Sequence, residues 1–106
     1  MTSEIVEYYK ALSNPVRLQI FLHIAKESRG SAPTTPKKES CVTEISKALN
    51  VPQPTVSNHL KVLKKAGLVK SLDVNTHCYQ YVTKDAAQIM LAQSEYIYIQ
   101  ANKTPY

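Results

Sequence analysis

Apolar residues recur at helical spacing in several stretches of this 106-residue chain, most clearly between Val51 and Val69. Val56, Leu60 and Leu63 follow at i, i+4 and i+7, which places them on one helical face. Gly67 can end this helix because glycine adopts the left-handed backbone conformation without steric cost. The arc opposite the apolar face carries small, polar or basic residues, namely Pro54, Ser57, Asn58, Lys61 and Lys65.

Two helices are expected at the N-terminus. The first is amphipathic and ends near Ser13, with apolar positions at Ile5, Tyr8, Tyr9 and Leu12. Asn14 and Pro15 restart the chain, since asparagine caps helices and proline is tolerated at the first helical position. The second helix runs from Val16 to about Lys26 and is expected at the centre of the core. It is apolar nearly all round, at Val16, Leu18, Ile20, Phe21, Leu22 and Ile24.

Residues 27–40 have no periodicity and contain Gly, Pro, Ser and Thr, which predicts a flexible loop insertion. A short helix is expected from Thr43 to Asn50, with Thr43 as its N-cap. Its inward positions are Ile45, Ala48 and Leu49. Residues 50–52 then form a turn before the segment described first, and two short helices joined in this way are typical of a helix-turn-helix.

Two β-prone runs follow, Leu68–Leu72 and Cys78–Val82, with turn-forming residues at 73–76 between them. Thr83 is expected to cap a last helix from Lys84 to about Ala101, and residues 102–106 form a tail. The sequence predicts a mainly α domain with a small β-hairpin (α+β), spanning 1–106 as a single unit. This is a winged helix-turn-helix in the order α-α-α-α-β-β-α.

The last helix has more apolar positions than a terminal helix of so small a domain needs to bury. They are Ala87, Met90, Leu91, Ile97 and Tyr98. Together with the first helix they would leave an exposed apolar patch. A two-fold homodimer through the first and last helices would cover that patch.

The net charge of +5 is concentrated in one part of the chain. Residues 47–72 contain five lysines and no acid, whereas the segments before and after them carry +1 and −1. This excess coincides with the helix-turn-helix and is the charge distribution expected of a surface that binds the phosphates of double-stranded DNA. A charge run by itself is also explained by a face of lysines that is simply exposed to solvent.

Other classes of protein fit the sequence poorly. No apolar run approaches the roughly 20 residues that span a bilayer, and the acidic N-terminus is unlike a signal peptide. A cytoplasmic location with reduced thiols follows. No nucleophile–base pair, glycine-rich phosphate loop or paired carboxylates can be assembled, so we expect neither an enzyme nor a cofactor.

Two segments resemble the ArsR/SmtB family. ALSNPVRLQIFLHI is similar to the family motif A-L-[SG]-[HN]-P-x-R-L-x-I-L, and CVTEISKALNVPQPTVSNHLKVLKKAGLV is similar to its recognition region. The resemblance covers residues from about 8 to 91. It implies a dimeric winged-helix repressor, and many members of that family release their operator when a metal or metalloid binds or when cysteines oxidise.

The resemblance places five residues where family members meet DNA: Gln53, Thr55, Ser57, Asn58 and His59. Asn58 and Lys61 project near the outward centre of the helix, where they can reach base edges or phosphates. His59 lies toward the flank of the core face, so a structural or phosphate-contacting role is as well supported for it as base recognition. The backbone-contacting lysines are Lys64, Lys65 and Lys70. At the wing tip, a minor-groove contact and a plain solvated turn are both open for Asn75, Thr76 and His77.

The sensor sites of the family are not reproduced. The arsenic-type pattern C-V-C-x-x-C is matched only at Cys41, and the last helix has Asp85 and Glu95 but no histidine for a zinc-type site. We therefore expect no metal. Cys41 at a helix N-terminus and Cys78 at the start of a strand leave a redox hypothesis, in which a thiol oxidant or reactive sulfur species is the effector. Small buried hydrophobes are the commoner use of free cysteines.

The favoured function is a sequence-specific, homodimeric transcriptional repressor on a palindromic operator. The alternative is a winged-helix module for protein interaction or non-specific architectural DNA binding. The exposed amides of the recognition segment favour the first, because a non-specific binder does not need them.

Overall fold

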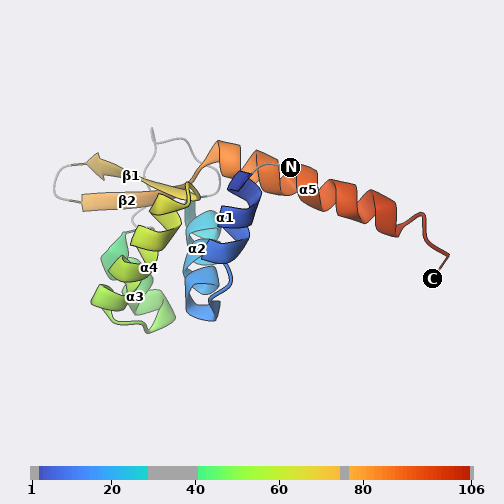
Figure 1. Cartoon of the computed structure of the whole chain (residues 1–106). Helices are drawn as coiled ribbons and strands as arrows, with labels where there is room; N and C mark the ends of the chain where they lie inside the picture. The colour runs from blue at the N-terminus through green and yellow to red at the C-terminus, as the bar shows by residue number, and fades with distance from the viewer. Residues whose placement is uncertain (1–2, 29–40, 75–76, 106) are drawn as a thin grey trace.

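The computed structural model describes residues 3–28, 41–74 and 77–105. Its order of elements, four helices, a hairpin and a last helix, confirms the predicted fold (Figure 1). The elements are α1 (Ser3–Ala11), α2 (Pro15–Ser28), α3 (Val42–Leu49), α4 (Gln53–Lys65), β1 (Val69–Val74), β2 (His77–Val82) and α5 (Lys84–Ala101). Residues 29–40 of the predicted loop, together with Asn75 and Thr76, lie outside the described residues.

Helix α2 begins as the sequence predicts and continues two residues beyond the expected end at Lys26. The Asn14 side chain caps it, because its Oδ1 accepts a hydrogen bond from the Arg17 backbone N–H at 3.0 Å. Its apolar residues are divided between two faces. Ile20, Phe21 and Ile24 are buried, whereas Leu18 and Leu22 are 37% and 54% exposed. The expectation that α2 is buried on nearly all sides is therefore wrong for these two leucines.

The helix-turn-helix is closed by local hydrogen bonds at residues 50–52. Asn50 adopts the left-handed conformation, with φ 54°, and its backbone N–H donates to the Ser46 carbonyl. The Ser46 hydroxyl donates to the Val51 carbonyl at 2.6 Å. These contacts fix the three-residue turn that the sequence predicts.

The start of α3 differs from the prediction. Cys41, not Thr43, occupies the N-cap position, and Thr43 lies within the first turn. The reason is a long-range contact, because Cys41 pairs with Tyr79 of β2 in an antiparallel bridge. That bridge holds Cys41 extended and allows the helix to begin at Val42. Of the predicted inward positions, Ile45 is buried and Leu49 half-buried, but Ala48 is exposed.

Helix α4 ends in a Schellman motif. Gly67 has φ +86°, its N–H donates to the Lys64 carbonyl, and the Leu68 N–H donates to the Leu63 carbonyl, both at 3.0 Å. The buried Thr83 then joins this end of α4 to the start of α5. Its hydroxyl donates to the Gly67 carbonyl at 2.7 Å and its N–H donates to the Leu68 carbonyl at 3.0 Å.

The wing is an antiparallel hairpin whose register runs from Val69 opposite Val82 to Val74 opposite His77. Each strand differs from its predicted bounds by only one or two residues. Gln80 is buried in the hairpin, and its side chain is hydrogen-bonded, as buried polar groups require. Its Oε1 accepts from the Ser71 hydroxyl at 2.8 Å, and its Nε2 donates to Cys78 Sγ at 3.4 Å.

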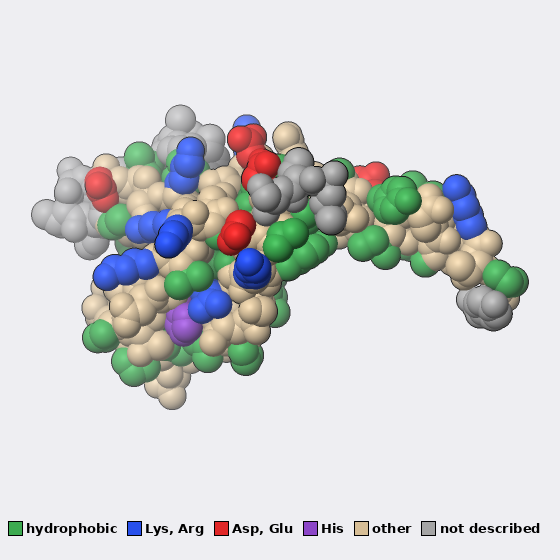
Figure 2. Space-filling view, viewed as in Figure 1, with side chains coloured by type: hydrophobic (Ala, Val, Ile, Leu, Met, Phe, Trp, Pro, Cys, Tyr) green, Lys and Arg blue, Asp and Glu red, His purple; other side chains and the backbone are tan. Residues whose placement is uncertain are grey.

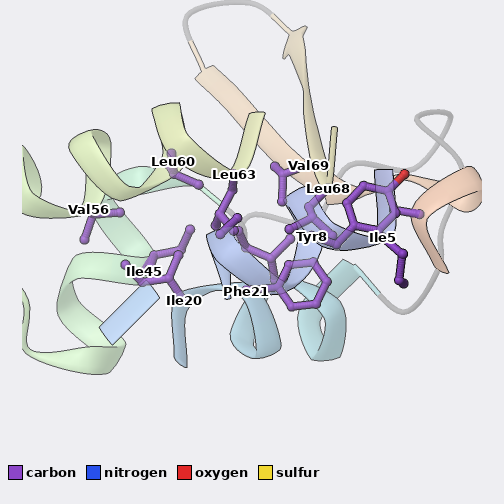
Figure 3. Packing of buried hydrophobic residues seen from close by; sticks show 13 residues of the cluster. Ile5, Tyr8, Ile20, Phe21, Ile45, Val56, Leu60, Leu63, Leu68 and Val69 are labelled. Carbon is purple, nitrogen blue, oxygen red and sulfur yellow. The ribbon is translucent and has the colours of Figure 1, made fainter. Parts of the chain in front are cut away.

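The core is continuous from the helix-turn-helix to α1 (Figure 3). Val56, Leu60 and Leu63 of α4 are buried, which confirms the apolar face predicted from their spacing. Tyr8 carries the core to α1. Burial of its ring raises the pKa of Tyr8, and the Glu4 and Asp85 carboxylates raise it further. The recognition segment, the wing and α1 are therefore packed into one unit.

Helix α5 leaves this core and projects away from it (Figure 1). The protein is accordingly elongated, with extents of 53 × 28 × 23 Å. Near its start α5 packs through Ala86, Ile89 and Met90, so the inward alanine is Ala86 and not Ala87. Beyond them its large apolar side chains are exposed, namely Leu91, Tyr96, Ile97, Tyr98 and Ile99.

Candidate nucleic-acid interface

The outer face of α4 is polar and open, while its inner face is fully buried. Gln53 and Asn58 are exposed, and Thr55, Ser57 and His59 are half-buried. Because the buried face fixes the rotation of α4 about its axis, these side chains have a defined direction. The first turn adds backbone N–H groups and the positive end of the helix dipole, which attract anions.

Four lysines surround this face, and all four are exposed. They are Lys61, Lys64 and Lys65 on α4 and Lys70 on β1. None of them forms an ion pair with an acid in the part of the chain that the structure describes. The space-filling view shows basic side chains gathered over α4 and the neighbouring hairpin (Figure 2). Cations without an acidic partner, gathered on one surface, are what a phosphate backbone requires.

His59 contacts another helix through a polar group. The Nδ1 atom of His59 lies 3.3 Å from a terminal guanidinium nitrogen, Nη1, of Arg17 on α2. Partial burial lowers the pKa of His59 below its usual value, and the Arg17 charge lowers it further. Sequence reasoning did not select Arg17 as functional. The available signal was a charged residue in the largely apolar first half of this helix, in the segment NPVRL.

The predicted wing contacts are only partly described. Lys70 is exposed on β1, and the backbone of His77 begins β2. Asn75, Thr76 and the side chain of His77 lie outside the described residues. Their assignment to a DNA contact or to a solvated turn stays a prediction.

Cys41 is buried and Cys78 half-buried, and neither forms a disulfide within the described residues. The bridge between Cys41 and Tyr79 shows that the second wing strand passes the start of α3. Successive strand side chains point to opposite faces, so Cys78 lies on the face opposite to the one that Tyr79 shares with Cys41. A direct disulfide between the two cysteines would therefore require β2 to rearrange.

A cavity of about 340 Å³ between α2 and α3 is lined by His23, Glu27, Glu44, Lys47 and Ala48. Glu27 follows His23 by one helical turn, and Glu44 faces the cavity from α3. Among residues 3–28, 41–74 and 77–105, no group of three or more His, Cys, Asp or Glu side chains is arranged to hold a metal ion. In the same residues, no helix is both long and apolar enough to cross a membrane.

The sequence and fold match those of known regulators. A family model described as "Bacterial regulatory protein, arsR family" matches residues 37–71. An uncharacterized HTH-type transcriptional regulator of Methanocaldococcus jannaschii is 37% identical over 79 residues, which cover 74% of this chain and 78% of that protein. The HTH-type transcriptional repressor SmtB of Mycobacterium tuberculosis is 44% identical over 63 residues, but these cover 59% of this chain and only 38% of the repressor.

A solved structure shares the fold over nearly the whole chain. It is the solution structure of a homodimeric winged helix-turn-helix DNA-binding domain from Mycobacterium bovis, described as a possible ArsR-family regulator. Its TM-score is 0.65 at 24% identity, and the match covers 98% of this chain and 83% of that one. The identity is low, so this likeness bears on the fold alone.

Proposed function

Because this chain belongs to the ArsR/SmtB family of winged-helix transcriptional regulators, we propose that it is a repressor that binds a palindromic operator as a homodimer. Its relatives are transcriptional regulators and not enzymes, and its helix-turn-helix is a DNA-binding unit. The observation that carries the proposal is the two-sided character of α4. One face is locked into the core, and the other presents amides, hydroxyls and lysines to solvent.

We assign base recognition to the polar centre of this face. Asn58 is exposed, and an Asn or Gln amide can pair with both N6 and N7 of adenine in the major groove. Gln53, Thr55 and Ser57 supply further hydrogen-bonding groups toward the start of the helix. Lys61 is close enough to the centre of the face to serve either a guanine edge or a phosphate.

Phosphate contacts are assigned to the remaining lysines of this surface. Lys64, Lys65 and Lys70 are exposed, and phosphate contacts position a protein on DNA without specifying sequence. In the wing, we retain Asn75, Thr76 and His77 as candidates for the adjacent minor groove. His59 is assigned to a phosphate for reasons given in the next subsection.

The dimer is supported by the exposed apolar surface of α5 and α1. Five large apolar residues of α5 are at least 50% exposed, and α1 adds Val6 and Tyr9 at 40% and 51%. Exposure of so many large apolar side chains is unusual on a monomer. The Mycobacterium bovis domain that has this fold is homodimeric. Two copies related by a two-fold axis would present two α4 helices to half-sites about one helical turn apart.

The test uses the full chain and duplexes from the region upstream of its own gene. We expect tight binding of two protomers to one duplex, measured by light scattering of the complex, and a footprint with two symmetric half-sites. A randomised duplex of equal length should bind much more weakly at the same salt concentration. Equal affinity for both duplexes would support the architectural alternative, and the absence of binding to any duplex would overturn the proposal.

A thiol oxidant or reactive sulfur species, acting at Cys41 or Cys78, is the effector that we carry forward. Cys78 is the more accessible thiol, and its Sγ accepts the hydrogen bond from Gln80 within the wing. Chemical modification there would disturb that contact. Operator binding by C41S and C78S, with and without oxidant, tests the idea. Oxidant sensitivity that is unchanged in both variants would remove it.

A further inference from the structure

Arg17 joins three parts of the molecule through separate groups. Its backbone N–H is the donor to the Asn14 cap at the start of α2, and its Nε donates to the carbonyl of Ala11, the last residue of α1. Its Nη1 lies 3.3 Å from His59 Nδ1 on α4. The half-buried guanidinium therefore spans from the end of α1 to the recognition helix.

The contact with Arg17 determines which nitrogen of His59 carries the proton. A guanidinium is a donor only and has no acceptor, so Nδ1 of His59 must accept. An imidazole whose Nδ1 accepts is neutral and carries its proton on Nε2. The lowered pKa of His59 agrees with a neutral ring near pH 7.

The flank of α4 that carries His59 is open to solvent. Val62, one turn further along the same flank, is 39% exposed, and Thr55, one turn before, is half-buried. With Nδ1 engaged by Arg17, Nε2–H is the remaining donor of the ring. A DNA phosphate oxygen is an acceptor of matching chemistry at the edge of a recognition helix.

We propose that Arg17 is a positioning residue for DNA binding, which holds His59 as the Nε2–H tautomer so that this ring donates a hydrogen bond to a DNA phosphate. The inference rests on the proposed function, since it requires that the outer face of α4 meets DNA. His59 then makes an uncharged contact that does not depend on the DNA sequence, and Arg17 acts on DNA binding only through His59. It also links the end of α1, the helix that carries Val6 and Tyr9 of the surface assigned to the dimer, with the helix assigned to DNA.

Two substitutions of His59 separate its two nitrogens. In H59N the amide oxygen can replace Nδ1 as the acceptor for Arg17, but nothing replaces Nε2–H. In H59Q the longer amide can place its NH₂ near the position of Nε2, but the acceptor at Nδ1 is lost. We expect H59N to weaken DNA binding by about tenfold per protomer, hence about a hundredfold for a dimer, as for a hydrogen bond to a charged group. We expect H59Q to stay within about threefold of the wild type, on the same magnitudes.

The loss in H59N should be the same for the operator and for a randomised duplex, because a phosphate contact carries no sequence information. A loss confined to the operator would show that Nε2–H meets a base, and would overturn the phosphate assignment. Wild-type affinity in H59N, or the reverse order of the two variants, would overturn the donor role. Failure of the wild type to bind any duplex would instead refute the proposed function itself.

The role of Arg17 is tested by a spectroscopic readout that a purely structural role would not move. In protein labelled with ¹⁵N-histidine, the His59 signals are identified by their absence in H59Q. In the wild type we expect Nδ1 to be unprotonated and Nε2 to be protonated. In R17K and R17M we expect a mixture of the two tautomers. Lysine keeps the charge but lacks the planar guanidinium, whose separate N–H groups contact the Ala11 carbonyl and the imidazole at the same time. A protonated Nδ1 in the wild type, or unchanged tautomers in both folded variants, would refute the assignment.

Discussion

The salt dependence of DNA binding should report directly on the four exposed lysines around α4. Lys61, Lys64, Lys65 and Lys70 are free of ion pairs with the described acids, so each can release a counterion from DNA. Four contacts per protomer are eight per dimer. At about 0.9 per phosphate, the slope of log K against log salt concentration is about −7. Affinity should then fall by roughly four orders of magnitude between 50 and 200 mM salt.

Replacing Lys65 by glutamine removes one contact per protomer and two per dimer. The slope should become shallower by about 2, and the variant should lose about tenfold less affinity than the wild type over the same salt range. Fluorescence anisotropy of a labelled operator duplex at five or more salt concentrations measures both slopes. The fold should be unaffected, because Lys65 is exposed.

K103Q is the matched control. Lys103 is also exposed and carries the same charge, but it follows α5 at the end of the molecule far from α4 (Figure 1). Its substitution should leave the slope unchanged. An equal effect of K65Q and K103Q would mean that net charge, and not the α4 surface, governs binding. An unchanged slope in K65Q would refute the assignment of this lysine to a phosphate.

Three further predictions concern stability. G67A should lower the free energy of unfolding by about 1–2 kcal/mol, because a φ of +86° is strained for alanine. Crowding is not the cause, since the added Cβ would meet Tyr8 Cε1 at an ordinary 4.0 Å. Urea titration measures the loss, and G67N should lose less stability than G67A. T83V should lose about 1 kcal/mol because the hydroxyl that donates to the Gly67 carbonyl disappears, and an unchanged midpoint of thermal unfolding would contradict the role of this contact. The lowered pKa of His59 means that the unfolded chain binds a proton more readily than the folded one, so its contribution to stability is complete above the ordinary pKa of 6.5 and declines as the pH falls below it. Urea midpoints from pH 7.5 to 5 should show a steeper decline in the wild type than in H59Q, and parallel curves would contradict the shift.

Local signals predicted most of the fold. Helix periodicity located the buried face of α4, the Asn14–Pro15 pair located the start of α2, and Gly67 located the end of α4, since each depends on residues close in sequence. The errors arose where distant residues decide. Cys41 became the cap of α3 through its bridge to Tyr79, and Leu18 is exposed because the core lies on the other side of α2.

The sequence predicts which side chains belong to the candidate interface, but not how they contact one another. The charge excess and the apolar spacing together indicated which arc of α4 faces solvent. The contact between Arg17 and His59 could not be inferred, because it joins residues 42 positions apart in the sequence. The orientation of Cys78 likewise depends on the register of the hairpin, which a short β-prone run does not determine.

The two hydrogen bonds of Thr83 have a mechanical consequence. They fasten the N-terminus of α5 to the backbone carbonyls of Gly67 and Leu68, which directly follow α4, so the two helices are joined at one point. Helix α5 has 18 residues and is about 27 Å long, which makes it a lever arm. A tilt of about 5° at its base displaces its far end by about 2 Å. A displacement of the far end by that distance likewise corresponds to a tilt of about 5° at the base. A partner that shifts the tip of α5 would therefore load the two Thr83 contacts, which lie directly beyond the end of the recognition helix.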